Sequence, residues 1–307
     1  MILYYAIGGG LGHLTRARAV AHTLGFNDRI AVLTASQFSS DPRVTAGLEI
    51  IKVPRCFERN LAEYRHWLQT LLCRLQPTDF YLDTFPAGII GEFCNFSFPS
   101  GVSLHYIARL LRFARYEDEM IGAPPAFKRT YVLEQLGELQ YHFVSDASVE
   151  TLPLILIDPP MVPDVETDRA IRIVEQSGPF WVVVHSGPPQ EVQQLIQYAH
   201  ELRSSEGSEA AIVVVSPRGQ QTIAVVEDGA RDREVCAHLH LYPARVLFQS
   251  ARRIITACGF NVMRETEEFA EKHRFVPFER RFDDQFLRAR RRRGGGRGEG
   301  AKGRRGC

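Results

Sequence analysis

A short stretch near the end of the chain limits the folds that this sequence can adopt. Ile254–Thr256 are β-branched, which favours a buried strand, and Gly259 follows where the chain would turn into a helix. The first amides of such a helix have no backbone partner, and with the positive end of the helix dipole they suit a diphosphate. Asn261 adds a short side-chain donor, and Glu265, one turn further on, can accept hydrogen bonds from a ribose.

This stretch and the residues after it resemble the donor-binding signature of glycosyltransferases with the two-domain GT-B fold, H-C-G-W-N-S-x-x-E followed by P and D-Q. The residues that match in order are Cys258, Gly259, Asn261, Glu265, Pro277, Asp284 and Gln285. The resemblance implies that Gly259 and Asn261 hold a diphosphate, Glu265 a ribose, and Asp284 with Gln285 the donor sugar. Two positions depart from the signature: Ala257 replaces its histidine, and Phe260, also expected at the donor site, replaces its tryptophan.

The beginning of the chain shows the same order of elements. Residues 2–7 favour a strand, residues 8–12 form a glycine-rich loop, and apolar residues at helical spacing predict a helix that ends near Gly25. His13 follows the loop directly, where the helix dipole disfavours the imidazolium, so this imidazole should be neutral and able to accept a proton. The loop glycines expected to face an acceptor or a phosphate are Gly9, Gly10 and Gly12.

Asp83 ends the strand that is expected at residues 78–83. In the common doubly wound order the fourth strand lies beside the first, so Asp83 and His13 should meet at the carboxyl ends of neighbouring strands. A carboxylate there would fix the tautomer of the imidazole and stabilise the imidazolium. Gly12-His13 and Leu82–Phe85 resemble the segments of glycosyltransferases that use a histidine base with an aspartate helper, and the resemblance implies that His13 and Asp83 are catalytic.

A second α/β domain is predicted from residue 179 onwards. Residues 180–185 favour its first strand, Ser186 and Gly187 its first loop, and the strand at 253–257 should lie beside the first strand. The amides of both loops would then face one diphosphate. In the resembled families a residue near Tyr242 lies by the nucleobase.

Apolar runs predict the remaining elements. Further strands are expected at 29–34, 48–53, 102–107, 139–144, 211–215 and 236–242, and a helix at 61–75. Arg109, Arg112 and Arg115 have helical spacing and predict a solvated helix face, with an anionic acceptor as the alternative. His105 and His142 are expected to be packed or surface residues.

The predicted architecture is α/β, with two doubly wound, Rossmann-like domains that face each other across a cleft, as in the GT-B type. A chain of 307 residues with 45% apolar residues can build two cores. The expected parts are an acceptor-side domain at 1–157, a proline-rich linker at 158–178, a nucleotide-sugar domain at 179–289 and a disordered basic tail at 290–307.

The formal net charge of +1 hides a split. Residues 288–307 carry nine basic residues and one acidic residue, which leaves 28 basic and 35 acidic residues in 1–287. An acidic body argues against specific nucleic-acid binding. The tail is expected to be solvated, with contact to an anionic membrane surface as the alternative. Six scattered cysteines and the absence of a long apolar run indicate a cytoplasmic protein.

These features predict a metal-independent, inverting glycosyltransferase that uses a nucleotide diphosphate sugar, first of all a UDP-sugar, and an unidentified acceptor hydroxyl. The nucleotide sugar is then a substrate, and no cofactor is expected. Two alternatives remain open. A sugar-nucleotide epimerase on the same fold would need the donor site alone, and a catalytically inactive nucleotide-sugar-binding subunit would explain Ala257.

Overall fold

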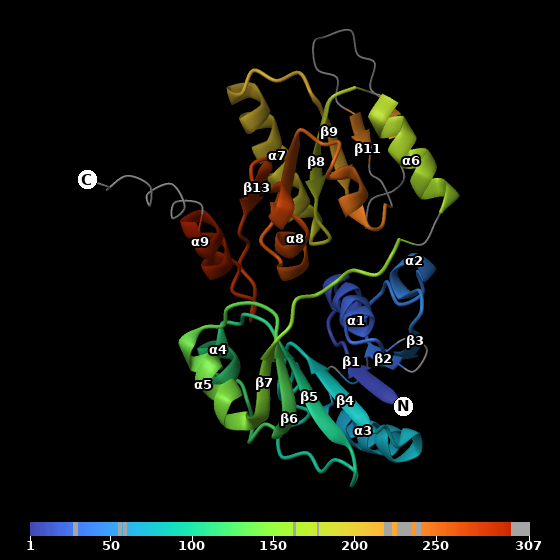
Figure 1. Cartoon of the computed structure of the whole chain (residues 1–307), viewed down its shortest axis with the longest axis vertical. Helices are drawn as coiled ribbons and strands as arrows, with labels where there is room; N and C mark the ends of the chain where they lie inside the picture. Colours follow the sequence, from blue (N-terminus) through green and yellow to red (C-terminus); the bar gives the residue numbers. More distant parts are fainter. Residues whose placement is uncertain are drawn as a thin grey trace, which may run out of the picture. The chain divides into compact units, whose positions relative to one another are not determined.

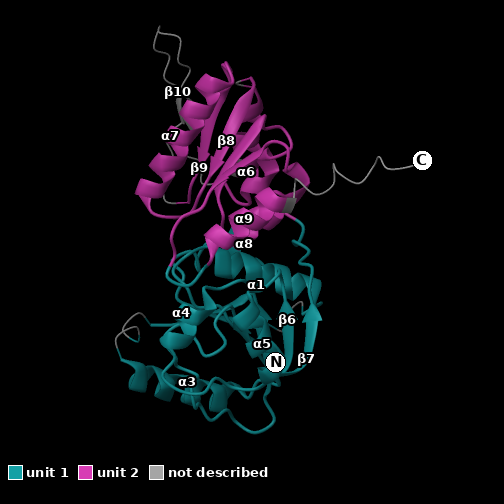
Figure 2. Ribbon diagram, turned by 90° about the vertical axis from the view of Figure 1, so that its left-hand side faces the viewer, with its two compact units in different colours: residues 1–160, 281–283 teal, residues 161–280, 284–307 magenta. Residues whose placement is uncertain are grey.

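The computed structural model describes residues 1–26, 30–54, 57, 60–161, 164–176, 178–217, 223–225, 235–237 and 241–295. The chain divides into two compact units, which Figure 2 colours separately. Unit 1 comprises residues 1–160 and 281–283, and unit 2 comprises residues 161–280 and 284–307. Each unit contains its own parallel sheet, as the alternation of strands and helices in the sequence predicts.

Unit 1 is built on a seven-stranded sheet in the order β3-β2-β1-β4-β5-β6-β7. Its strands are β1 (Ile2–Tyr5), β2 (Ile30–Thr34), β3 (Glu49–Lys52), β4 (Asp79–Asp83), β5 (Ser103–Ala108), β6 (Phe127–Val132) and β7 (Ser148–Pro153). Its helices are α1 (Gly12–Thr23), α2 (Pro42–Thr45), α3 (Leu61–Leu75), α4 (Phe113–Asp118) and α5 (Glu138–Ala147). All pairings in this sheet are parallel, and β1 lies between β2 and β4, so the predicted doubly wound order is confirmed.

Side-chain alternation divides unit 1 into two layers around the sheet. Leu3 and Tyr5 of β1 point into a core that is closed by Leu68 and Leu72 of α3. Tyr4, between them, therefore points to the opposite face of the sheet. Helix α1 ends as predicted, because Gly25 follows it with a positive φ of 67° that glycine adopts without strain.

One predicted strand of unit 1 is wrong. Residues 139–144 belong to α5 and not to a strand, and α5 lies beside α4 and near β7 (Figure 1). The run contains Tyr141, Phe143 and Val144, which favour strands, but Gln140 and Val144 are the residues that the structure buries. A spacing of four residues is that of a helix face.

Unit 2 contains a four-stranded parallel sheet in the order β13-β12-β8-β9. Its elements are α6 (Val165–Gln176), β8 (Phe180–Val184), α7 (Pro189–Ser205), β9 (Ala211–Val215), β10 (Ile223–Val225), β11 (Val235–Ala237), β12 (Arg253–Ala257), α8 (Phe260–Glu265), β13 (His273–Val276) and α9 (Gln285–Gly295), with short 3-10 helices at Ala244–Leu247 and Glu267–Phe269. The predicted contact between the strand at 253–257 and the first strand of this domain is confirmed by the parallel pairing of β12 with β8. β11 pairs with β10 in an antiparallel ribbon and does not join the parallel sheet, and residues 238–240 of the strand predicted at 236–242 lie outside the described residues.

The predicted linker contains a helix. Within residues 158–178, helix α6 packs its apolar side against the core of unit 2, where Val174 is buried and Ala170 and Ile171 contact it. Pro159 and Pro160 precede this helix and do not interrupt it, so the expected linker is not extended throughout.

The predicted tail also begins with a helix. Helix α9 extends to Gly295, whereas disorder was expected from residue 290, and residues 296–307 lie outside the described part of the chain. Arg288 donates to the carbonyl oxygen of Cys258 at 2.8 Å, and Arg292 donates to that of Thr266 at 3.1 Å. These carbonyls flank α8, so the guanidinium groups satisfy acceptors at both of its ends. No helix among the described residues is long and apolar enough to cross a membrane.

A segment late in the sequence completes unit 1. Residues Arg281–Asp283 belong to unit 1, although Arg280 and Asp284 belong to unit 2. Phe282 packs against Phe85 and Tyr116, and its carbonyl accepts a hydrogen bond from the amide of Arg112.

Candidate functional site

The two predicted catalytic residues meet on one face of the sheet of unit 1. Phe80 and Leu82 of β4 join the core with α3, so alternation places Asp83 on the opposite face, together with Tyr4. The His13 Nδ1 atom lies 2.6 Å from Oδ2 of Asp83. The Asp83 side chain is fully buried, whereas 14% of the His13 side chain is exposed, so a substrate can reach the imidazole and not the carboxylate.

Arg16 is a third member of this cluster that the sequence reasoning missed. It lies three residues after His13, on the same face of α1. Its Nε donates to Asp83 Oδ1 at 2.6 Å and its Nη2 donates to Oδ2 at 2.5 Å, a bidentate ion pair with a buried carboxylate. Tyr4 donates to the same Oδ1 at 3.2 Å. The carboxylate of Asp83 is therefore shared among three residues.

This environment sets the protonation states of the pair. Burial lowers the pKa of His13 below its usual value, Arg16 and Arg109 lower it further, and Asp83 opposes the shift. Burial alone would raise the pKa of Asp83, but Arg16 and His13 outweigh it and hold the pKa of Asp83 well below its usual range. The resting pair is thus a neutral imidazole beside a carboxylate, as predicted for a base.

Thr84 connects this cluster to a second ion pair. Its hydroxyl oxygen accepts from Arg16 Nη2 at 2.8 Å and from Arg109 Nε at 3.0 Å, and Arg109 forms an ion pair with Asp283. Thr84 is fully buried and has a φ of 72°, which a β-branched residue adopts only where its surroundings impose it. The hydroxyl of Tyr106 donates to its carbonyl at 2.7 Å and helps to hold it there.

The position of Arg109 corrects the expectation of a solvated helix face. Arg109 follows β5 directly, precedes α4 and is buried, because two polar partners far away in the sequence receive its guanidinium group. His105 is buried as expected, and its Nε2 lies 3.0 Å from the carboxylate of Asp79 on the neighbouring strand.

The glycine-rich loop has one position where a side chain would collide with the site. A Cβ atom on Gly8 would lie 2.3 Å from Cδ2 and 2.5 Å from Nε2 of His13. On Gly9 or Gly10 it would meet nothing within 4 Å. Gly12 is the first residue of α1. The loop therefore leaves space beside Gly9 and Gly10, whose predicted contact with an acceptor or phosphate stays a prediction, and makes room for the imidazole at Gly8.

In unit 2 the predicted diphosphate residues lie where β12 passes into α8. Gly259 is the N-cap of α8, without a side-chain cap hydrogen bond, and a Cβ atom there would meet nothing within 4 Å. Its φ of −66° is one that any residue can adopt, so the glycine is not needed for the turn, and its use is the open space beside the backbone. Asn261 and Glu265 are half-buried, Phe260 is buried, and Glu265 lies 3.9 Å from Arg264.

Asp284 and Gln285 have structural partners within unit 2. Asp284 Oδ1 accepts from the amide of Leu287 at 2.9 Å and so caps α9. Gln285 is buried, and its side-chain oxygen accepts from the amides of Cys258 at 3.3 Å and Phe278 at 3.0 Å. A contact between Gln285 and a sugar would therefore use the side-chain nitrogen, and the sugar-binding role of both residues stays a prediction.

Ser186 and Gly187 follow β8, the strand beside β12, so the two predicted loops begin at the same end of the sheet. Sequence reasoning missed what stands next to them. His185 is buried, and its Nε2 lies 2.7 Å from Oε2 of Glu191, whose carboxylate also forms an ion pair with Arg280. A Cβ atom on Gly187 would lie 2.2 Å from Nε2 of His185, so this glycine lets the imidazole pack against the backbone.

His185 also lies beside the position where the signature histidine is missing. Val184 pairs with Thr256, so the next residues along the parallel strands are His185 and Ala257. Ala257 and Phe278 share one core cluster, and the His185 ring centre lies 5.5 Å from that of Phe278, so both residues occupy one face of the sheet. The structure thus has an imidazole next to the place where the signature would put one. Tyr242 is half-buried ahead of the 3-10 helix at Ala244–Leu247, and its predicted place by a nucleobase stays a prediction.

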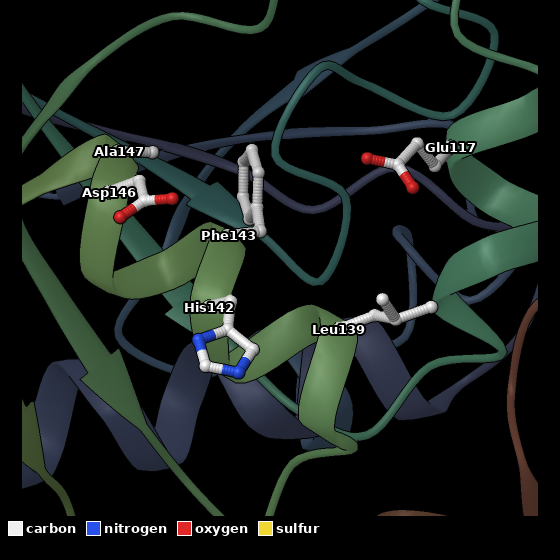
Figure 3. A pocket seen from close by; sticks show the side chains of 6 residues that line it. All are labelled: Glu117, Leu139, His142, Phe143, Asp146 and Ala147. Carbon is white, nitrogen blue, oxygen red and sulfur yellow. The ribbon is translucent and has the colours of Figure 1, made fainter.

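Unit 1 also has a surface pocket of about 410 Å³ between α4 and α5. Figure 3 shows Glu117 on one side and Asp146 with Phe143 on the other, and His142 and Leu139 also line the pocket. None of its lining residues belongs to the His13 cluster. Among the described residues, no group of His, Cys, Asp and Glu side chains is arranged to hold a metal ion.

Comparison with solved structures defines the class of fold: the chain has the GT-B fold, with two Rossmann-like domains. It is similar to S. aureus MnaA solved with UDP, with 9% identity, a TM-score of 0.56 and coverage of 91% of this chain and 80% of that one. It is also similar to the spinosyn forosaminyltransferase SpnP, with 13% identity, a TM-score of 0.57 and coverage of 98% of this chain and 86% of that one. A third similar structure is UDP-glucose:anthocyanidin 3-O-glucosyltransferase in complex with UDP, with 13% identity, a TM-score of 0.54 and coverage of 95% of this chain and 83% of that one. No family model and no curated protein matches the sequence.

Proposed function

We propose that this protein is a glycosyltransferase that transfers a sugar from a nucleoside diphosphate to an acceptor hydroxyl. The observation that carries the proposal is the His13–Asp83 pair at the carboxyl ends of β1 and β4 in a GT-B fold. Two of the similar structures contain UDP, and this supports a uridine nucleotide as the first donor to test.

In this proposal His13 is the general base. Its Nδ1 is held by Asp83, so the acceptor proton goes to Nε2, and Asp83 fixes the tautomer and stabilises the imidazolium that forms. The acceptor oxygen then attacks the anomeric carbon, and the bond from that carbon to the diphosphate oxygen breaks. A single displacement of this kind inverts the configuration.

Unit 2 would bind the donor through the loops after β8 and β12. The amides at the start of α8 and at Ser186-Gly187 would stabilise the charge of the leaving diphosphate, and the open space beside Gly259 allows a phosphate to approach the backbone. Glu265 would receive the ribose hydroxyls. In this scheme amides take the role that a divalent ion has in metal-dependent transferases.

Replacing the base tests the proposal. His13→Ala should lower transfer from a UDP-sugar by about 100-fold or more, the usual contribution of a general base, and leave UDP binding unchanged because the donor loops lie in unit 2. His22→Ala is the matched control, since His22 is exposed on the same helix. Undiminished transfer by His13→Ala would remove the base assignment.

The alternatives give different products. An epimerase would convert the donor without any acceptor, so incubation of the protein with UDP-sugar alone, followed by NMR of the sugar, separates the two enzymes. UDP binding without turnover of donor or acceptor would indicate a binding subunit instead.

A further inference from the structure

Arg16 changes what the His13–Asp83 pair can do. In a pair of histidine and aspartate alone, the carboxylate is free to stabilise the imidazolium. Here both oxygens of Asp83 are already held by Arg16, at 2.6 and 2.5 Å, and the guanidinium Nη2 also lies 3.1 Å from Nδ1 of His13. Arg16 is only 3% exposed, so water screens its charge little.

The charged groups around His13 balance before any proton is transferred. Arg16 on α1 faces Asp83 at the end of β4, and Arg109 after β5 faces Asp283. These two cations balance the two carboxylates. The titratable neighbours Tyr4 of β1 and Tyr106 of β5 are uncharged donors, Tyr4 to Asp83 and Tyr106 to the carbonyl of Thr84. A proton on His13 would add a third positive charge beside Arg16, and Asp83, the carboxylate that contacts His13, already shares its charge with Arg16, so it stabilises the imidazolium less than an unshared carboxylate would.

We propose that Arg16 is a positioning residue that makes His13 a weak base and thereby restricts the acceptor to acidic hydroxyl groups, such as those of phenols and enols. This inference rests on the proposed function and narrows its acceptor. A weak base removes a proton efficiently only from a group that releases it readily, because the rate of proton transfer follows the difference in acidity. An aliphatic alcohol is a much weaker acid, so the same base removes its proton more slowly.

The step balances with the groups at hand. The proton of the phenolic hydroxyl passes to Nε2 of His13, and the oxygen forms a bond to the anomeric carbon. The bond from that carbon to the diphosphate oxygen breaks, and the nucleoside diphosphate leaves with the electron pair. The imidazolium then releases its proton to water. Burial and the cationic neighbours lower the pKa of His13, which agrees with this role.

The first arm of the test measures the base itself. The imidazole of His13 is titrated by NMR in the wild type, in Arg16→Gln and in Arg16→Lys, with His13→Gln to assign its signal. Arg16→Gln should raise the pKa of His13 by about one unit or more, because a buried cation is lost, whereas Arg16→Lys keeps the cation and should stay near the wild type. An unchanged pKa in Arg16→Gln would overturn the inference.

The second arm measures acceptor choice, and its main comparison uses the wild type, so this comparison remains decisive if Arg16→Gln does not fold. Substituted phenols and benzyl alcohols of matched size are offered with one UDP-sugar donor. The wild type should show kcat/KM at least about 100-fold higher for the phenols, within the usual contribution of proton transfer, and Arg16→Gln should narrow this ratio. Equal rates for both acceptor classes would overturn the inference.

The two arms also separate this inference from the function beneath it. Absence of transfer to either class would overturn the proposed function and the acceptor restriction together, whereas the NMR titration would still report whether Arg16 controls His13. Transfer with an unaffected His13 would leave the glycosyltransferase in place and remove Arg16 from its mechanism.

Discussion

The substitution Gly8→Ala should displace the imidazole of His13 without replacing any chemical group of the site. In Gly8→Ala the new Cβ would stand 2.3 Å from Cδ2 of His13, while ordinary contacts begin at 3.4 Å, so the imidazole must move by about 1 Å. Its bond to Asp83 is 2.6 Å long, and a shift of this size, or a change of rotamer, removes the alignment that the transfer needs. A misplacement of about 1 Å costs about 100-fold in rate, or about 2.7 kcal/mol in the activation barrier.

The assay is kcat/KM for transfer from a UDP-sugar, with UDP binding and thermal unfolding measured in parallel. Gly9→Ala is the control for the position of the imidazole and not for acceptor binding. A Cβ atom there meets nothing within 4 Å, so His13 should keep its wild-type NMR titration in this variant. Wild-type transfer by Gly8→Ala, with the titration of His13 also unchanged, would refute the reasoning that the imidazole must pack against this glycine.

Three further predictions concern Gly187, His273 and Asp283. Gly187→Ala should weaken UDP binding about 10-fold in calorimetry, because its Cβ would lie 2.2 Å from Nε2 of His185. Gly294→Ala is the control, because a Cβ atom at this exposed position of α9 meets nothing within 4 Å, and equal losses in the two variants would contradict the prediction. Burial lowers the pKa of His273 to about 3, so as the pH falls through about 6.5 this histidine is protonated in the unfolded chain and not in the folded one. The free energy of unfolding should therefore drop by about 2 kcal/mol between pH 7.5 and pH 5. In urea titrations His273→Gln should show a smaller drop. Asp283→Asn should lower the free energy of unfolding by about 3 kcal/mol, because the buried Arg109 loses its carboxylate partner. Asp118→Asn, at an exposed position, should change it by almost nothing. Similar values for both variants would show that the Arg109–Asp283 ion pair contributes little to stability.

Much of the fold could be predicted from local patterns. The helix expected at 61–75 coincides with α3, and the structure shows that Asn60 caps its first turn. The topological rule then placed Asp83 beside His13 across 70 residues of sequence. Short runs are harder to assign. Residues 139–144 predict a strand, but aromatic residues occur in strands and helices alike, and here the packing of the run selects a helix.

The rest of the candidate site could not be predicted in this way. The proximity of Arg16 to His13 could have been predicted, because Arg16 lies about one helical turn after it. Its ion pair with Asp83 could not, because Asp83 lies 67 residues further on. Asp283 pairs with Arg109 across 174 residues, and no periodic pattern connects them. The positive φ of Thr84 is imposed by tertiary hydrogen bonds, and nothing in the local sequence calls for it.

The placement of Arg281–Asp283 in unit 1 has a consequence for biogenesis. A ribosome delivers residues 1–160 long before residue 283. Until then Arg109 lacks the carboxylate of Asp283, and the aromatic cluster of Phe85 and Tyr116 lacks Phe282. A fragment that ends at residue 160 would therefore lack part of the first unit. Its maturation is coupled to synthesis of the second.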